Sequence, residues 1–132
     1  MKPRIVITRE IFDDVVDYLK RHCEVDDNQA DKPYSPEALA AKLSGIDGLM
    51  CALTDRIDAA LIARAPELKV VANIAVGYNN IDVPACSARD IKVTNTPGVL
   101  DDSTADLAFA LMLATARRIT EVESYILSLI HI

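Results

Sequence analysis

The residues best placed to do chemistry stand at the end of an apolar run, residues 70–76. Gly77 ends this run, and glycine leaves the backbone open to a ligand because it has no side chain. Parallel sheets bind ligands just beyond the carboxyl ends of their strands. If residues 70–76 form such a strand, the amide groups of Val76 and Gly77 can hold a small anion. The alternative is an ordinary strand–loop–helix connection that binds nothing.

The flanking residues are of the types that would position this anion site. Residues 70–76 are mostly apolar and β-branched with little alternation, which is typical of a strand covered on both faces. Asn79 and Asn80 favour a turn. Asp82 can cap a following helix, and Pro84 suits the first turn of that helix.

Residues for most other chemistry are missing or badly spaced. Neither of the two histidines, His22 and His131, is near a strand-end loop, so neither is a convincing general base. The three cysteines are far apart in the sequence and lack CxxC spacing, which disfavours disulfides and a zinc site. The four glycines cannot form a G-x-G-x-x-G or Walker A loop. We therefore predict no catalytic residue, no metal site and no dinucleotide fingerprint in this chain.

A phospho-receiver domain would share the architecture that the sequence predicts. Such a domain needs an acidic pair after the first strand, an acceptor aspartate after the third and a lysine after the fifth. Here Glu10 is the single acid after the first strand, and Asn95 and Thr96 follow the fifth. Asp55 alone does not support that interpretation.

Composition limits the classes of protein further. The chain has 132 residues, of which 51% are hydrophobic, so it can form one domain with a real core. A net charge of −6 without a Lys/Arg cluster argues against nucleic acid and anionic membranes as partners. No apolar run reaches the length of a membrane span, and the N-terminus leads straight into a strand without a signal peptide. With its scattered cysteines, the chain is expected in the reducing cytoplasm.

Alternating elements predict an α/β fold, a flavodoxin-like doubly wound parallel sheet of about five strands in the order 2-1-3-4-5. The strands are expected at residues 5–7, 23–25, 48–52, 70–76 and 91–94. Thr8 is expected to cap the first helix, which runs to about Arg21. We expect a core that contains Ile5, Ile7, Phe12, Val16, Leu49, Met50, Val71, Ile74, Val93 and Leu107.

Later helix starts are also marked in the sequence. Ser35 and Asp58 are expected N-caps, and residues 103–106 read as a capping box that opens the longest helix. That helix is expected to run for about 20 residues, or roughly 30 Å, which suits an element linking two domains.

An ordered set of short blocks resembles the D-isomer-specific 2-hydroxyacid dehydrogenases. The blocks are LKVVAN at residues 68–73, VGYNNID at 76–82, VTNTPGVL at 93–100 and TADLA at 104–108. Within this family the chain looks most like the glyoxylate/hydroxypyruvate reductases, as LTDRID at 53–58 and IVITREI at 5–11 indicate. The resemblance covers roughly residues 1–123.

The resemblance implies specific roles. Val76 and Gly77 would hold the carboxylate of a small 2-oxoacid through their amides, and Leu53 would line the pocket. Thr104 would lie close to the nicotinamide of NAD(P)H, which the parent enzyme would use to make the D-2-hydroxyacid. The family's catalytic Arg, Glu and His come later in its chain, so this chain alone is expected to be inactive and to bind no cofactor.

The resemblance also implies a domain plan. Residues 1–100 would be the N-terminal part of the substrate-binding domain, and residues 101–132 a helix leading to a dinucleotide-binding domain. Residues 124–132 depart from the family pattern, which suggests a truncated or frame-shifted sequence. A homodimer is expected for the parent enzyme. The alternative is a non-catalytic binding or regulatory relative with the same fold.

Overall fold

A computed structural model, which describes residues 2–128, shows five parallel strands in one sheet ordered β2-β1-β3-β4-β5. The predicted fold class and strand order are therefore confirmed. The strands are β1 (Arg4–Ile7), β2 (Glu24–Asp26), β3 (Gly48–Ala52), β4 (Val70–Ile74) and β5 (Lys92–Thr94). The helices between them are α1 (Asp13–His22), α2 (Pro36–Lys42), α3 (Ala59–Ala63) and α4 (Val83–Ser87). The chain divides into two compact units, Met1–Pro97 and Gly98–Ile132.

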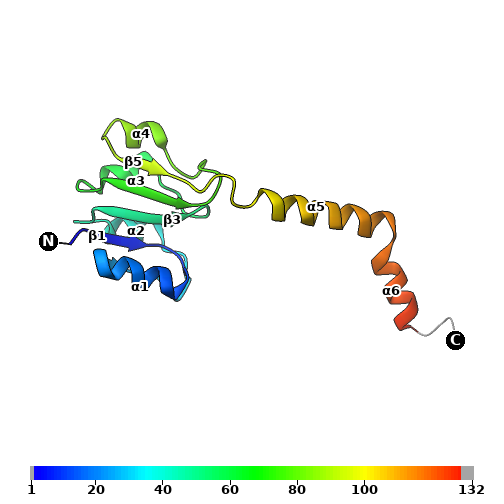
Figure 1. The fold of residues 1–132 in the computed structure, drawn as a ribbon. Coiled ribbons are helices and arrows are strands. Elements are labelled where there is room, and N and C mark those ends of the chain that lie inside the picture. The colour runs from blue at the N-terminus through cyan, green and yellow to red at the C-terminus, as the bar shows by residue number, and fades with distance from the viewer. Residues whose placement is uncertain (1, 129–132) are drawn as a thin grey trace. The chain divides into compact units, whose positions relative to one another are not determined.

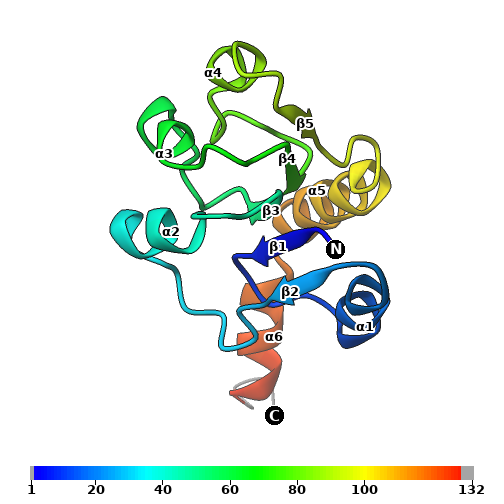
Figure 2. The ribbon, with the colours of Figure 1, turned by 90° about the vertical axis from the view of Figure 1, so that its left-hand side faces the viewer.

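The sheet of the first unit carries its helices on two faces. Figure 2 shows α2, α3 and α4 over one face and α1 on the other, beside β2. The main core lies between the sheet and α2–α4. Its fully or nearly fully buried side chains include Val6, Leu39, Leu43, Leu49, Cys51, Leu61, Ile62, Val71 and Cys86.

Side-chain caps fix where three of these helices begin, as the sequence predicts. Ser35 Oγ accepts from the Ala38 amide at 3.2 Å at the start of α2. Asp58 Oδ1 accepts from the Leu61 amide at 3.0 Å at the start of α3. Asp82 Oδ1 does the same for the Ala85 amide at 2.9 Å, which sets the direction in which α4 leaves the loop after β4.

The first helix begins later than predicted. Thr8 does not cap it, because α1 starts at Asp13 after Phe12, without a side-chain cap. Thr8 is 1% exposed, and its hydroxyl donates to Asp55 Oδ2 at 2.5 Å. The error arose because a threonine after a strand suits a cap and a buried polar network equally well.

Three expected core residues are exposed: Phe12, Ile74 and Leu107. Phe12 precedes α1 and is 81% exposed. In β4, Val71 and Asn73 are buried, whereas Ile74 is 43% exposed. The expectation of a strand covered on both faces is thus wrong at the end of β4, where α1 covers little of the second face.

The second unit begins with α5 (Asp101–Ala116) and continues as α6 (Ile119–Leu127), which Figure 1 labels. The predicted capping box is wrong, because Thr104 already donates its amide to the Leu100 carbonyl at 2.9 Å inside the first turn. The expected single long helix is also wrong. Arg118 takes a left-handed conformation with φ of 52° and separates α5 from α6. No glycine or proline marks this break. Part of the unusual tail, residues 129–132, lies outside the described residues.

Candidate functional site

Three neighbouring strands end at the same edge of the sheet, and their loops form the candidate site. Parallel register places Ile7 beside Met50, and Ala52 beside Ile74. The Thr8 amide continues the first pairing by donating to the Met50 carbonyl at 3.0 Å. The loops after β1, β3 and β4 therefore start from one short stretch of sheet edge.

Asp55 ties the loop after β3 to the end of β1. Its side chain is only 8% exposed and accepts from the Thr8 hydroxyl and, at 2.9 Å, from the Ala52 amide. Arg9 lies across the same loop, with Nε 3.9 Å from Asp55 Oδ1 and Nη2 donating to Thr54 Oγ1 at 2.6 Å. These contacts satisfy a buried carboxylate and fix the loop that carries Leu53.

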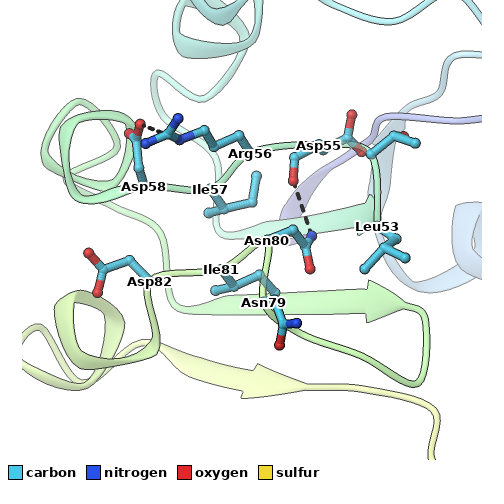
Figure 3. A pocket seen from close by; sticks show the side chains of 10 residues that line it. Leu53, Asp55, Arg56, Ile57, Asp58, Asn79, Asn80, Ile81 and Asp82 are labelled. Carbon is cyan, nitrogen blue, oxygen red and sulfur yellow. Dashed lines mark hydrogen bonds and ion pairs between the residues drawn. The ribbon is translucent and has the colours of Figure 1, made fainter.

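Asn80 joins the loop after β4 to the loop after β3. Its Nδ2 donates to the carbonyls of Ala52 and Asp55, each at 3.1 Å, and Figure 3 shows the side chain reaching toward Asp55. A parallel β-bridge between Ile57 and Ile81 also joins these two loops. The two loops therefore behave as one structural unit.

Three successive carbonyls of the loop after β4 are held by hydrogen bonds. The Thr96 amide donates to the Ala75 carbonyl at 3.0 Å. Asn95 Nδ2 donates to the Val76 carbonyl at 2.8 Å, and Asn73 Nδ2 to the Gly77 carbonyl at 2.8 Å. Carbonyl and amide point in opposite directions across a trans peptide, so these bonds also orient the amides that follow.

The amide groups of Val76 and Gly77 have no acceptor among residues 2–128. Both residues are exposed. A Cβ built on Gly77 would meet only Leu53 Cδ1, at 3.9 Å, which places Leu53 next to this amide pair. The structure thus brings Leu53, Val76 and Gly77 together at one edge, while Thr104 lies in α5 of the second unit.

The backbone at Gly77 does not use the positive φ angles that are open to glycine. Positive φ angles occur at Gly45 and Gly98, and Gly77 is not among the positive-φ glycines. A side chain at Gly77 is therefore not opposed by backbone strain, and its effect would fall on whatever approaches the amides.

A hollow of about 490 Å³ adjoins Leu53 on the side of the two joined loops. Figure 3 shows the residues around it, which are Leu53, Asp55, Arg56, Ile57, Asp58, Asn79, Asn80, Ile81 and Asp82, together with Thr54. Arg56 is paired with Asp58 at 3.3 Å, and Asp82 is used as a helix cap. Since these charged side chains already have partners, the open amide pair is the better candidate for an anion site.

The helices of residues 2–128 begin with acidic residues. Pyrophosphate binds where bare amides at a helix N-terminus meet a glycine-rich turn. Here α1 and α5 carry two acids each in the first turn, α2 carries Glu37, and α3 and α4 are capped by Asp58 and Asp82. These negative charges would repel the diphosphate.

Residues 2–128 contain no group of three potential metal-binding side chains placed to hold an ion. Their helices also lack the length and apolar character needed to cross a membrane.

The three cysteines are free, as expected, but their environments differ. Burial, followed by the nearby Asp55 carboxylate, raises the pKa of Cys51 to about 12 from 9.0. Burial and Asp82 also raise the pKa of Cys86. The shift at Cys51 favours the neutral thiol in the folded chain, so this thiol does not reduce the free energy of unfolding below pH 9 and reduces it as pH rises toward 12.

Native thiol labelling should follow these environments. At pH 8 we expect a charged disulfide reagent to modify Cys23, which is partly exposed, and to leave Cys51 and Cys86 unmodified until denaturant is added. Mass spectrometry of quenched samples gives the extent of labelling at each site. Native labelling of Cys51 at the rate of Cys23 would show that the β3 end is open.

Sequence reasoning missed the polar network that holds the site. Asn73 is 3% exposed near the end of β4, and in the sequence it stands out only as part of a block that resembles the family. One signal was present, because an amide side chain inside a run of β-branched apolar residues must find partners when buried. The partners themselves, which are Cys51 in β3 and Gly77 and Asn80 in the loop after β4, could not be identified from spacing.

Residues 5–130 match the family model described as the catalytic domain of D-isomer specific 2-hydroxyacid dehydrogenases. A glyoxylate reductase of Korarchaeum cryptofilum is 45% identical over 126 residues, which is 96% of this chain and 38% of the relative. A glyoxylate reductase of Thermococcus litoralis is 44% identical over 128 residues, 97% of this chain and 39% of the relative. The chain therefore spans less than half the length of these curated relatives.

A solved structure agrees with these matches. The structure of an NADPH-dependent glyoxylate/hydroxypyruvate reductase from Sinorhizobium meliloti, in complex with NADP and malonate, superposes with a TM-score of 0.77 at 30% identity. The match covers 97% of this chain and 39% of that one.

Proposed function

We propose, since this chain belongs to the family of D-isomer specific 2-hydroxyacid dehydrogenases, that it supplies the carboxylate-binding part of a 2-oxoacid reductase. The whole enzyme would reduce a small 2-oxoacid of the glyoxylate or hydroxypyruvate type to the D-2-hydroxyacid with NAD(P)H. The names of the similar proteins support this substrate class.

The observation that carries the proposal is the open pair of amides at Val76 and Gly77. Both amides would donate hydrogen bonds to the substrate carboxylate, and Leu53 would cover the apolar side of the substrate. A hydrogen bond to a charged group contributes about 1.5–3 kcal/mol. Association costs at least about 4 kcal/mol, so the chain alone should bind an oxoacid no tighter than the millimolar range.

The remaining parts of the reaction are assigned to residues outside this chain. We place the hydride donor and its pyrophosphate site there, because the helix starts described above do not suit a dinucleotide. We place the catalytic Arg, Glu and His there because the resemblance to the family implies it. Residues 1–100 would then serve as the substrate-binding part and residues 101–132 as the link to the cofactor domain, with Thr104 facing the nicotinamide.

Assembly and compartment follow the same proposal. We propose a homodimer for the whole enzyme and a cytoplasmic location. The free cysteines support a reducing compartment. The large apolar side chains of α5, such as Phe109 and Met112, are more than half exposed, which supports their burial against other parts of the enzyme.

A chimeric enzyme tests this function. Residues 1–123 would replace the matching part of the Korarchaeum cryptofilum reductase, to which the chain is 45% identical. We expect glyoxylate-dependent oxidation of NADH or NADPH, measured by the absorbance of the reduced nicotinamide. Circular dichroism and a cofactor-binding titration establish that the chimera has folded. A folded chimera that binds cofactor and does not reduce any 2-oxoacid would contradict the proposal.

A further inference from the structure

We infer that Asn95 and Asn73 are positioning residues of the carboxylate site, which act through the backbone and do not touch the substrate. The inference rests on the proposed function and adds the residues that set its geometry. Asn95 follows β5 and Asn73 lies in β4, so the two side chains approach the loop from different strands.

Each asparagine holds one peptide plane. The Val76 carbonyl and the Gly77 amide share a plane, and Asn95 Nδ2 donates to that carbonyl at 2.8 Å. The trans peptide then points the Gly77 N–H away from Asn95. The preceding plane, which carries the Val76 N–H, is held through the Ala75 carbonyl by the Thr96 amide at 3.0 Å.

Asn73 holds the next plane and is itself held. Its Nδ2 donates to the Gly77 carbonyl at 2.8 Å and to Asn80 Oδ1 at 3.2 Å, while its Oδ1 accepts from the Cys51 thiol at 3.5 Å. Because Asn80 is bonded to the loop after β3, this chain of contacts connects Gly77 to the loop of Leu53. The geometry between Leu53 and the amide pair is therefore set before a ligand arrives.

Hydrogen bonds that order this loop before a ligand binds should increase its affinity for the ligand. A loop whose carbonyls are free can turn its amides in several directions, and a ligand must then order the loop at the cost of binding free energy. Asn95 is the better test, because it is partly exposed and its one bond in the described residues is to Val76. Asn73 is buried, so its replacement would also disturb folding.

The experiment is a titration of the isotope-labelled 132-residue chain with sodium glyoxylate, followed through amide chemical shifts at constant ionic strength. Asn95→Ala should raise Kd by about three- to tenfold, the range expected for one net hydrogen bond. Asn95→Asp should raise Kd more, since its carboxylate cannot donate and repels the ligand. Thr94→Ala is the matched control, because Thr94 lies exposed in β5 next to Asn95 and holds none of these peptide planes, and its Kd should equal that of the wild type.

The outcomes separate this inference from the function on which it rests. If wild-type chain shows no shifts at Val76 and Gly77, the proposed function fails and the inference fails with it. If the wild type binds and both Asn95 variants bind equally well, the function stands and the inference is overturned. A scalar coupling across the bond from Asn95 Nδ2 to the Val76 carbonyl, measured in the wild type, gives a second test that needs no variant; its absence would also overturn the inference.

Discussion

Gly77→Val should lower kcat/KM for glyoxylate by about 10- to 100-fold in the chimeric enzyme, with an unchanged melting temperature. The expected loss corresponds to one hydrogen bond to a charged group. A Cβ at this position has room, since the nearest atom is Leu53 Cδ1 at 3.9 Å, and no positive φ opposes it. The variant should therefore fold as the wild type does, and its branched side chain should block the approach of a carboxylate.

A graded variant separates this blocking effect from general damage. Gly77→Ala adds only the Cβ and should fall between the wild type and Gly77→Val. Steady-state rates at several glyoxylate concentrations give KM and kcat for all three proteins. Equal kcat/KM values across the series would remove Gly77 from the carboxylate site.

Leu49→Ala should lower the free energy of unfolding by about 2–5 kcal/mol, the usual cost of deleting a buried leucine side chain. Leu49 is 1% exposed in β3, where it pairs with Val71 and packs in the main core. Ile74→Ala is the matched control in the next strand, because Ile74 is 43% exposed and should lose only about 1 kcal/mol.

Urea denaturation followed by circular dichroism measures both changes. The difference between the two variants matters more than either value, because it tests which face of the sheet carries the core. A larger loss for Ile74→Ala than for Leu49→Ala would mean that the second face is covered more completely than the structure shows.

The positions of the strands along the chain and the start of three helices could be predicted because they depend on local signals. Apolar runs mark the strands, and Ser35, Asp58 and Asp82 each bond to an amide three residues later. Such caps require no knowledge of distant residues. Thr8 was misread because its partner, Asp55, is 47 residues away.

The place of the candidate site can be proposed from the sequence and stays a prediction, whereas the residues that support it could not be proposed. Gly77 after an apolar strand indicates a ligand site from sequence alone. The bonds that orient its neighbours come from Asn95 and Asn73, and nothing in their spacing reveals that they meet at residues 76 and 77. The break at Arg118 could not be predicted either, because neither glycine nor proline occurs there.

The most direct measurement is a pair of amide-shift titrations of the wild-type chain, one with glyoxylate and one with NADH and NADPH. We predict shifts centred on Leu53, Val76 and Gly77 with a Kd in the millimolar range or weaker, and no micromolar binding of either nucleotide. The open amide pair leads to the expectation for glyoxylate, and the acids at the helix starts lead to the expectation for the nucleotides. Glyoxylate shifts centred elsewhere, or micromolar affinity for NADH or NADPH, would contradict the assignment of a carboxylate site without a cofactor site to this chain.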